Sequence, residues 1–464
     1  MQRRDFIGLT LFSAALSSVR AAEEPAWDVI IAGAGGAGLA AAVSAAEAGA
    51  RRIIVFEKAA VVGGHTILAS GSVSVAAGSR GDPAADMAAE IVASGGEPAL
   101  AETLARESAA LPVWLAGMGV RWEPRLFRAV GSMAVRNMST GSMRGGYEYV
   151  QALNARARAL GVEIRLCEPV RSLLTDAGRV TGVVTAGSDG TERFHRARAV
   201  VLATGGFGAN VPMRRRWRPE LDATYRTTAD PTGLLGDGAT GDGIDMAEAI
   251  GAGLTDMDAM QLIPYNGGRV LDYAGGEIWL NAEGRRFVSE DADFRDIQNA
   301  IERQPGRMMW ALTDAKSRKG AGIGAKMASG IVKTADSIEE LARAMEVSED
   351  VLRGTLERYN HMASEKRDLD FGRTAFTQTI DTPPFYFGIE RLGIHMTLGG
   401  ISVDERARVL RRDGSVIPGL YAAGETAGGI HGRNRLGGNA LTSAFIFGRI
   451  AGAEAANNVD QNNQ

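Results

Sequence analysis

The sequence lacks the residues that cross-linked, metal-binding and nucleic-acid-binding proteins need. Its 464 residues include one cysteine, Cys167, which excludes an internal disulfide bond and a C-x-x-C-H haem attachment site. The five histidines and this cysteine show no metal-ligand spacing, so we expect no metal. The net charge is −4, and the basic residues are scattered rather than clustered. Charge therefore gives no support for nucleic-acid binding.

No long hydrophobic run is present near the N-terminus either. The apolar stretch at residues 7–19 is too short to cross a bilayer, so we expect no integral membrane segment. It follows Arg3, Arg4 and Phe6, which is the form of a twin-arginine export signal. The alternative is an amphipathic N-terminal helix. We expect residues 1–22 to be a signal peptide and the mature protein to be periplasmic.

The most informative segment is residues 28–58, which has the pattern of a dinucleotide-binding unit. Gly33, Gly35 and Gly38 fit G-x-G-x-x-G, which permits a tight turn and the close approach of a pyrophosphate. Glu57 ends the next apolar run, where an acid can accept hydrogen bonds from ribose hydroxyls. We expect strands at residues 29–32 and 53–56 with a helix at 37–49 between them. Strand, glycines, helix, strand and acid in this order indicate a bound nucleotide cofactor.

The chain has 464 residues, of which 45% are hydrophobic, so it can bury a large core and is longer than one typical domain. From residue 258 to 396 the composition changes and charged helical segments appear, which predicts an inserted domain. Further strands are expected at residues 163–167, 170–175, 180–186, 199–204 and 419–423, and helices at 82–119 (two), 144–161, 308–319, 337–366 and 440–457. There is no second strand-glycine-helix unit for a nicotinamide cofactor, and glycine-rich segments are spread along the chain. Both features favour FAD over NAD.

Eight short segments, taken together, resemble a known family. GAGGAG, GGHTILASG, ATGGF, GDG, NAEGRRFVSE, HMTLGG, LYAAGE and HGRNRLGGNAL occur in the order found in soluble fumarate reductase flavoproteins, the flavin portion of flavocytochrome c and its relatives. The resemblance spans residues 28 to about 456. It implies an α/β fold: a Rossmann-type, glutathione-reductase-like FAD domain at residues 24–257 and 397–457, with an inserted α+β clamp or capping domain at 258–396 that closes over the flavin.

The resemblance also implies which residues bind FAD. His65 occupies the position where membrane-bound succinate dehydrogenases attach FAD covalently, whereas soluble relatives usually have asparagine and bind FAD without a bond. We expect non-covalent FAD and leave a covalent link at His65 open. The implied cofactor residues are Gly33, Gly35, Gly36, Gly38, Glu57, Lys58, Gly64, His65, Thr66, Ser70, Gly71, Val170, Thr204, Gly205, Asp242, Gly424, Glu425, Asn439, Ala440 and Leu441.

Two arginines carry the chemistry that the resemblance implies. Arg435 matches the arginine that grips a substrate carboxylate, and Arg295 matches the arginine proposed as the proton donor. In that mechanism the reduced flavin N5 gives a hydride to one alkene carbon while the clamp arginine protonates the other. Arg295 is, however, one residue further from Glu290 than in the flavocytochrome pattern. From spacing alone, the alternative for Arg295 is a surface ion pair with Asp291 or Asp293.

Other departures from the pattern concern the substrate. Ile263 stands where fumarate reductases have a histidine for the distal carboxylate, and Met396 replaces the second of two histidines, after His395 and before Thr397. We therefore expect Ile263, His395, Met396, Thr397 and Arg435 to contact a substrate whose distal end is apolar. The family's relay residues are absent, and Asp272 or Tyr273 could substitute.

The expected activity is reduction of the carbon–carbon double bond of a small α,β-unsaturated carboxylate, of acrylate, methacrylate or arylacrylate type. Since the chain has no haem site, its electrons would come from a separate, cytochrome c-like donor protein. Three alternatives remain open. They are fumarate or succinate itself as the substrate, a dehydrogenase that acts on a saturated acid or a ketosteroid, and a flavin electron-transfer subunit without its own substrate.

Overall fold

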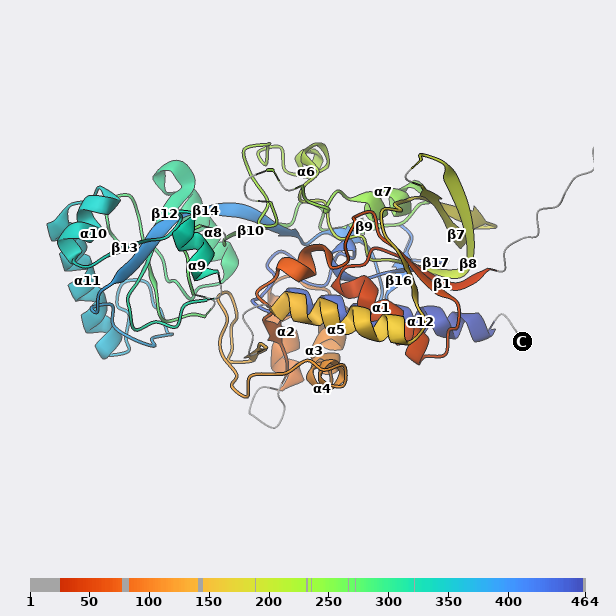
Figure 1. Cartoon of the computed structure of the whole chain (residues 1–464), viewed down its shortest axis with the longest axis horizontal. Helices are drawn as coiled ribbons and strands as arrows, with labels where there is room; N and C mark the ends of the chain where they lie inside the picture. Colours follow the sequence, from red (N-terminus) through yellow and green to blue (C-terminus); the bar gives the residue numbers. More distant parts are fainter. Residues whose placement is uncertain are drawn as a thin grey trace, which may run out of the picture.

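The computed structural model describes residues 26–461 except 77–82, 141–144, 188, 231–232, 235, 266, 272 and 321. The predicted signal peptide lies outside these residues. The chain forms two lobes, each built on its own sheet (Figure 1). No helix in the described part of the chain combines the length and the apolar character needed to cross a membrane.

The larger lobe contains a mostly parallel sheet with the order β5-β2-β1-β8-β17-β16. Its strands are β1 (Trp27–Ala32), β2 (Ile53–Phe56), β5 (Glu163–Arg165), β8 (Glu192–Leu202), β17 (Val416–Ala422) and β16 (Arg408–Leu410). Each neighbouring pair is parallel except β16 with β17. Residues 29–32 are fully buried, as expected for a central parallel strand that is covered on both faces. The predicted mixed α/β class is confirmed.

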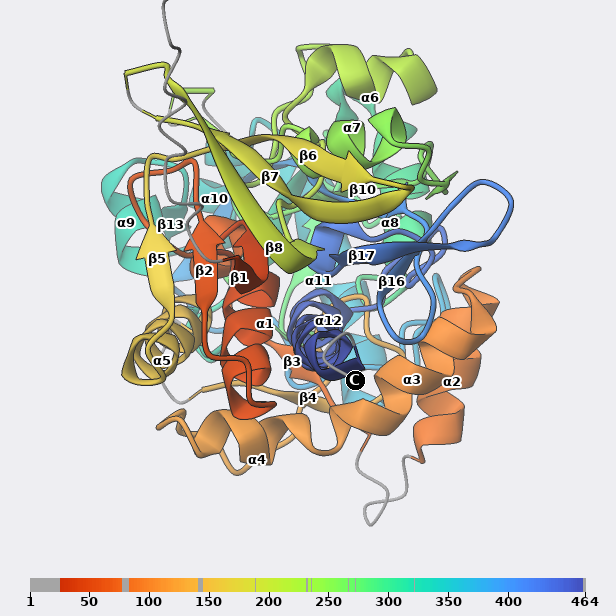
Figure 2. The ribbon, with the colours of Figure 1, turned by 90° about the vertical axis from the view of Figure 1, so that its right-hand side faces the viewer.

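Three helices cover one face of this sheet: α1 (Gly36–Glu47), α5 (Gly145–Ala159) and α12 (Asn439–Gln461) (Figure 2). Helices α1 and α12 pack closely because glycines face backbone. A Cβ atom on Gly448 would lie 2.4 Å from the carbonyl oxygen of Ala37, and one on Gly452 would lie 2.1 Å from that of Ala41. On the other face, β6 (Val170–Asp176) and β7 (Arg179–Ala186) form an antiparallel ribbon with the first part of β8.

Smaller elements complete this lobe. They are η1 (Gly64–Leu68), β3 (Val73–Ser74), α2 (Ala84–Ala93), α3 (Pro98–Ser108), α4 (Leu111–Ala116), β4 (Asn137–Met138), α6 (Val211–Trp217), α7 (Asp242–Ala249), β9 (Leu254–Thr255), β15 (Gly400–Ile401) and η4 (Gly424–Thr426). The prediction of two helices between residues 82 and 119 is wrong, because a third helix, α4, starts at Leu111 directly before Pro112. Proline is well tolerated in the first turn of a helix.

The smaller lobe is an antiparallel sheet flanked by helices. Its strands are β10 (Met260–Pro264), β11 (Ile278–Leu280), β12 (Met308–Thr313), β13 (Lys333–Ala335) and β14 (Phe385–Thr397), and its helices are α8 (Phe294–Glu302), η3 (Pro305–Arg307), α9 (Ile323–Ala328), α10 (Ile338–Met345) and α11 (Glu349–Ser364). The predicted helix at residues 308–319 is wrong. Its first half is β12, which lies between β11 and β14, so sheet pairing overrides the local pattern.

Strand β14 joins the lobes. Its first part pairs with β12 and β13, and its last part pairs with β10 (Figure 1). The strand ends at Thr397, between the lobes. The domain boundaries at residues 258 and 396 remain predictions.

Candidate active site

A cavity of about 1000 Å³ lies at the carboxyl ends of β1 and β2. The larger lobe contributes the turn between β1 and α1, the segment around η1, and the start of α12. The smaller lobe contributes Ile263 in β10, Tyr265 directly after it, Phe294 at the start of α8, and the end of β14. Ligands of open α/β sheets bind at this end of the strands. The cavity therefore brings residues from the whole length of the chain to one place.

The glycine turn between β1 and α1 lines the cavity. Gly33 has φ of +103°, and a Cβ atom there would lie 2.3 Å from the carbonyl oxygen of Ala203. Gly35 is the N-cap of α1 and makes no side-chain cap, although the Gly36 amide donates to Thr66 Oγ1 at 3.1 Å. A helix N-terminus with free amides attracts a pyrophosphate. Gly38 does not line the cavity; its Cβ would meet the carbonyl oxygen of Gly33 at 1.9 Å, so it serves packing.

Charged residues surround the end of β2. One Glu57 oxygen accepts from the Ala34 amide and the other from the Ala59 amide, both at 2.8 Å, which fixes the carboxylate and leaves lone pairs for ribose hydroxyls. Lys58 Nζ donates to Asp242 at 2.7 Å. This pair joins the β2 end to the start of α7.

The cavity surface fits FAD. Gly205 has φ of +79°, and a Cβ atom there would meet no atom within 4 Å, so this backbone presents open space to a flat ring. All of the sequence-predicted cofactor residues line the cavity except Gly38 and Asn439. Asn439 is buried at the start of α12. When bound, FAD supplies a flavin that, once reduced, can transfer a hydride.

His65 is held between two carboxylates. Its Nε2 lies 2.6 Å from Asp237 Oδ1, and its Nδ1 lies 3.6 Å from Glu425 Oε2. Burial disfavours the charge on the imidazole, but the hydrogen bonds and charges of Asp237 and Glu425 prevail and raise the pKa of His65 to about 10. The pKa of Asp237 falls to about 2: burial opposes this shift, and the hydrogen bond and charge of His65 drive it. His65 is thus an imidazolium at neutral pH.

Arg435 is a buried cation with 5% of its surface exposed. No carboxylate in the described part of the chain lies within ion-pair distance of it, its Nε has no hydrogen-bond partner, and its Nη1 reaches only the Leu436 carbonyl at 3.3 Å. Burial lowers the pKa of Arg435 to about 10, against the opposing effects of Tyr265 and Glu425. A buried guanidinium without an anion is costly, and a carboxylate in the cavity would satisfy it.

The cavity that Arg435 lines also contains the apolar residues predicted for the substrate. Ile263 and Met396 are buried and line the cavity, as predicted for the distal end of the substrate. His395 accepts from or donates to Thr228 Oγ1 at 2.9 Å through Nδ1. Its pKa is well below the ordinary value, because of burial first and then the charges of Arg435 and His65, so the ring is neutral. Thr397 donates its amide to Glu425 Oε1 at 2.8 Å and fixes that carboxylate beside the cavity.

Comparison with known proteins supports the assignment of the cavity as an FAD site. A family model described as an FAD binding domain matches residues 28–441. The fumarate reductase (cytochrome) of Shewanella frigidimarina is 34% identical over 92% of this chain and 77% of its own, and the urocanate reductase of Eggerthella lenta is 34% identical over 92% and 74%. The open conformation of a flavocytochrome c3 fumarate reductase superposes with a TM-score of 0.73 at 32% identity, over 94% of this chain and 78% of that one. The chain belongs to the fumarate reductase flavoprotein family.

Membership in the fumarate reductase flavoprotein family makes the chain an FAD-dependent oxidoreductase. The predictions of the family and of FAD are confirmed. Whether FAD is attached covalently, and the role of each cofactor residue, remain predictions. No group of His, Cys, Asp and Glu side chains suited to a metal ion occurs in the residues that the structure describes.

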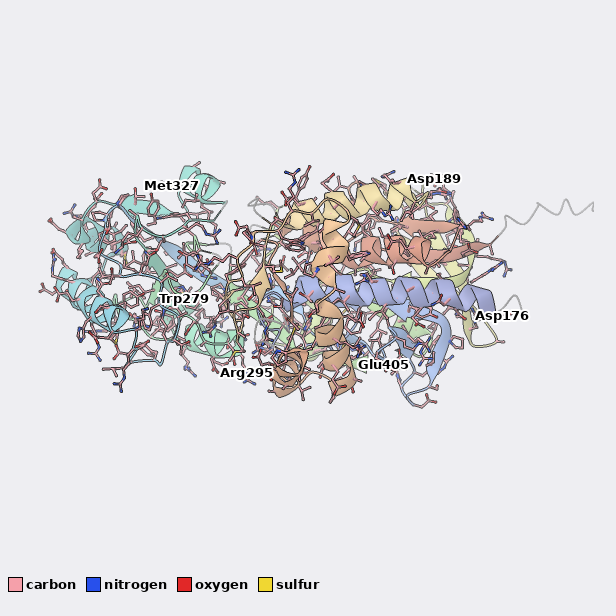
Figure 3. All side chains as sticks on the ribbon, turned by 90° about the horizontal axis from the view of Figure 1, so that it is seen from below. Asp176, Asp189, Trp279, Arg295, Met327 and Glu405 are labelled. Atoms are coloured by element: carbon pink, nitrogen blue, oxygen red, sulfur yellow. The ribbon has the colours of Figure 1, made fainter. Side chains whose placement is uncertain are left out.

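The structure places the Arg295 side chain outside the cavity, so its predicted role as proton donor stays a prediction. Its side chain is 57% exposed, lies 3.8 Å from Asp293, and faces a shallow outer hollow with Asp258 and Arg433. Figure 3 shows Arg295 at the outer edge of the molecule. The extra residue after Glu290 is the physical reason. Consecutive residues of a helix point about 100° apart, so the residue before Arg295 takes the inward position.

That inward residue is Phe294, which sequence analysis missed. It lines the cavity, and its ring lies under the guanidinium of Arg435. Tyr265 was also missed and lines the same wall. The available signals were the distance of Phe294 from Glu290 and the position of Tyr265 directly after Ile263-Pro264. Asp272 lies outside the described residues, and Tyr273 is not among the residues that line the cavity.

Proposed function

We propose that the protein reduces the carbon–carbon double bond of an α,β-unsaturated monocarboxylate, with Arg435 holding the carboxylate. The observation that carries the proposal is the buried, anion-free guanidinium on the wall of the FAD cavity. The names of the relatives, a fumarate reductase and a urocanate reductase, support the same reaction type.

The chemistry explains why an arginine is needed. Hydride addition to the β-carbon drives negative charge toward the carboxylate, and a bidentate guanidinium stabilises that charge in the transition state. In a buried cavity this stabilisation exceeds what water could provide. Arg435 thus serves both binding and catalysis.

The substrate's other end would contact apolar side chains. Ile263, Met396 and Phe294 line the same cavity as Arg435, and the Phe294 ring lies 5.2 Å from Arg435 Cζ. The second carboxylate of fumarate would lose hydrogen bonds to water here without regaining them, at a cost of about 1–3 kcal/mol. Acrylate, methacrylate or arylacrylate types fit better than a dicarboxylate.

A substrate panel tests the proposal. The holoenzyme is supplied with electrons from a reduced viologen dye, and turnover is measured with fumarate, methacrylate and cinnamate. We expect kcat/KM for at least one monocarboxylate to exceed that for fumarate. Faster turnover of fumarate would contradict the monocarboxylate assignment. Oxidation of a saturated acid or a ketosteroid without reduction of any unsaturated acid would favour a dehydrogenase, and flavin that no organic substrate reoxidises would favour an electron-transfer subunit.

We also propose that FAD is bound without a covalent link. His65 Nε2 lies 2.6 Å from Asp237 Oδ1 and the raised pKa keeps the ring protonated, and an imidazolium has no lone pair for nucleophilic attack. Acid precipitation of the purified protein should leave the yellow colour in the supernatant. Yellow protein in the pellet would show a bond.

The electron donor and the compartment complete the proposal. The chain has no haem-binding cysteine pair, so a separate cytochrome c-like protein would reduce the flavin in the periplasm after twin-arginine export. Replacing Arg3 and Arg4 with lysines should retain the full-length protein in the cytoplasm. Unchanged periplasmic activity after cell fractionation would contradict this route.

A further inference from the structure

Reduction of a double bond consumes a proton as well as a hydride, and the structure leaves that proton without a predicted donor. Arg295 faces the outer hollow rather than the FAD cavity. A donor must lie within hydrogen-bond reach of the substrate carbon. If the protein has the proposed function, another group in the cavity must supply this proton.

The histidines of the cavity are poor donors. His395 and His431 are neutral at pH 7, since burial and the charge of Arg435 lower both pKa values, that of His431 to about 3. His65 is charged, but its two ring N–H groups point at Asp237 and Glu425. Loss of its proton would leave two carboxylates uncompensated. None of the three histidines therefore has both a proton to give and an N–H group that is free to point at the substrate.

Tyr265 has the position and the freedom that the histidines lack. It directly follows β10, lines the cavity, and packs its ring 5.4 Å from the ring of His395. Its hydroxyl makes no hydrogen bond with any residue that the structure describes. Together with Glu425 it is one of the two ionisable groups that act electrostatically on Arg435. We propose that the Tyr265 hydroxyl donates the proton that completes reduction of the double bond.

The step balances with the groups named. With reduced FAD bound, the cofactor would supply the hydride for a C–H bond at the β-carbon. The π electrons would then form a second C–H bond at the α-carbon with the Tyr265 proton, and the O–H electrons would remain on the phenolate. The neighbouring Arg435 charge stabilises this phenolate until water returns the proton.

Lys326 is the main rival. It lines the cavity from α9, and burial lowers the pKa of its ammonium group. Its Nζ, however, donates to the Arg269 carbonyl at 2.6 Å, which directs the group into the smaller lobe. Single substitutions distinguish the two candidates, because only replacement of the true donor should lower turnover without changing the Kd of the acid.

The test compares Tyr265→Phe with Lys326→Met and with Tyr273→Phe, a matched control that removes a phenol outside the cavity lining. Turnover of the best unsaturated acid is measured on the holoenzyme. Its Kd is measured by calorimetry on the oxidised enzyme, where the acid binds but cannot react. We expect Tyr265→Phe to lower turnover roughly 10²- to 10⁴-fold, the usual contribution of a general acid. The Kd of the acid for Tyr265→Phe and the melting temperature of this variant should stay close to the wild-type values. Tyr273→Phe should retain wild-type turnover.

Three results would overturn the inference. Tyr265→Phe could keep half or more of the turnover, it could weaken binding by the same factor as turnover, or Lys326→Met could cause the larger loss of turnover at unchanged Kd. If the wild-type enzyme reduces no unsaturated acid, the proposed function itself fails. That outcome is visible before any variant is made.

Discussion

The guanidinium of Arg435 lies over the face of Phe294, with Cζ 5.2 Å from the ring centroid. The ring stabilises the buried cation without neutralising it, because an aromatic face attracts positive charge but carries no net charge of its own. Arg435 consequently keeps its ability to bind an anion. This pair is the structural basis for a site that takes one carboxylate and an apolar tail.

Replacing Arg435 with methionine should abolish tight binding of the unsaturated acid. A charged hydrogen-bonded pair contributes about 1.5–3 kcal/mol, so Kd should rise about 10- to 150-fold. The melting temperature should not fall, because the substitution removes a buried charge and leaves no carboxylate newly unpaired. Calorimetry and thermal unfolding measure the two effects.

Arg433→Met is the matched control. Arg433 is two residues away, is 55% exposed, and pairs with Asp258 on the outer surface. It should bind the acid as the wild type does. Equal losses of affinity in the two variants would show that Arg435 is not the carboxylate-binding residue.

Substituting Arg295 with alanine should leave turnover within about twofold of wild type. The side chain is exposed, and its ion pair with Asp293 spans 3.8 Å. Water screens such a pair, so it contributes little to the structure. Steady-state rates with reduced dye are sufficient as a readout. A loss of 100-fold or more would restore Arg295 as the proton donor and would require the smaller lobe to reorient during catalysis.

The difference between Arg435 and Arg295 shows how far sequence reasoning reaches. Residues 28–58 could be assigned from the sequence because their glycines, buried strands and acid act locally, and β2 was predicted at its observed bounds, Ile53–Phe56. Ile263, Met396 and Arg435 were placed in the cavity by the segments that contain them.

The outward orientation of Arg295 could not be predicted, because one inserted residue turns a helical side chain by about 100° and no local pattern shows which neighbour faces inward. Strand β12 was missed for a related reason. Its partners, β11 and β14, are distant in sequence, and a short apolar run does not show whether it will form a strand in a sheet or a helix.

Replacing Ile263 with histidine should shift specificity toward fumarate. The residue lies buried in the cavity wall, where a histidine could offer a hydrogen bond to a second carboxylate. One such bond to a charged group predicts about a tenfold or greater rise in the ratio of kcat/KM for fumarate to that for methacrylate. Ile263→Leu keeps the wall apolar and should leave the ratio near the wild-type value. An unchanged ratio for Ile263→His would mean that the distal end of the substrate lies elsewhere.

His65 should make the stability of the FAD-free protein depend on pH. Its folded-state pKa, about 10, lies above the ordinary 6.5, so its contribution to the free energy of unfolding is full below pH 6.5. The contribution declines as pH rises from 6.5 and is lost above about 10. The difference in stability between wild type and His65→Gln, measured by denaturant unfolding, should shrink over this range. A constant or growing difference would contradict the imidazolium between Asp237 and Glu425.

The most direct test of the account is a single-turnover experiment. Photoreduced holoenzyme is mixed anaerobically with methacrylate or cinnamate, and the return of oxidised flavin absorbance is followed for the wild type and for Arg435→Met. The account predicts rapid reoxidation of the wild-type flavin by at least one of these acids, and loss of that phase in the variant at the same acid concentration. Wild-type flavin that stays reduced with every unsaturated acid, or equal rates in the two proteins, would contradict it.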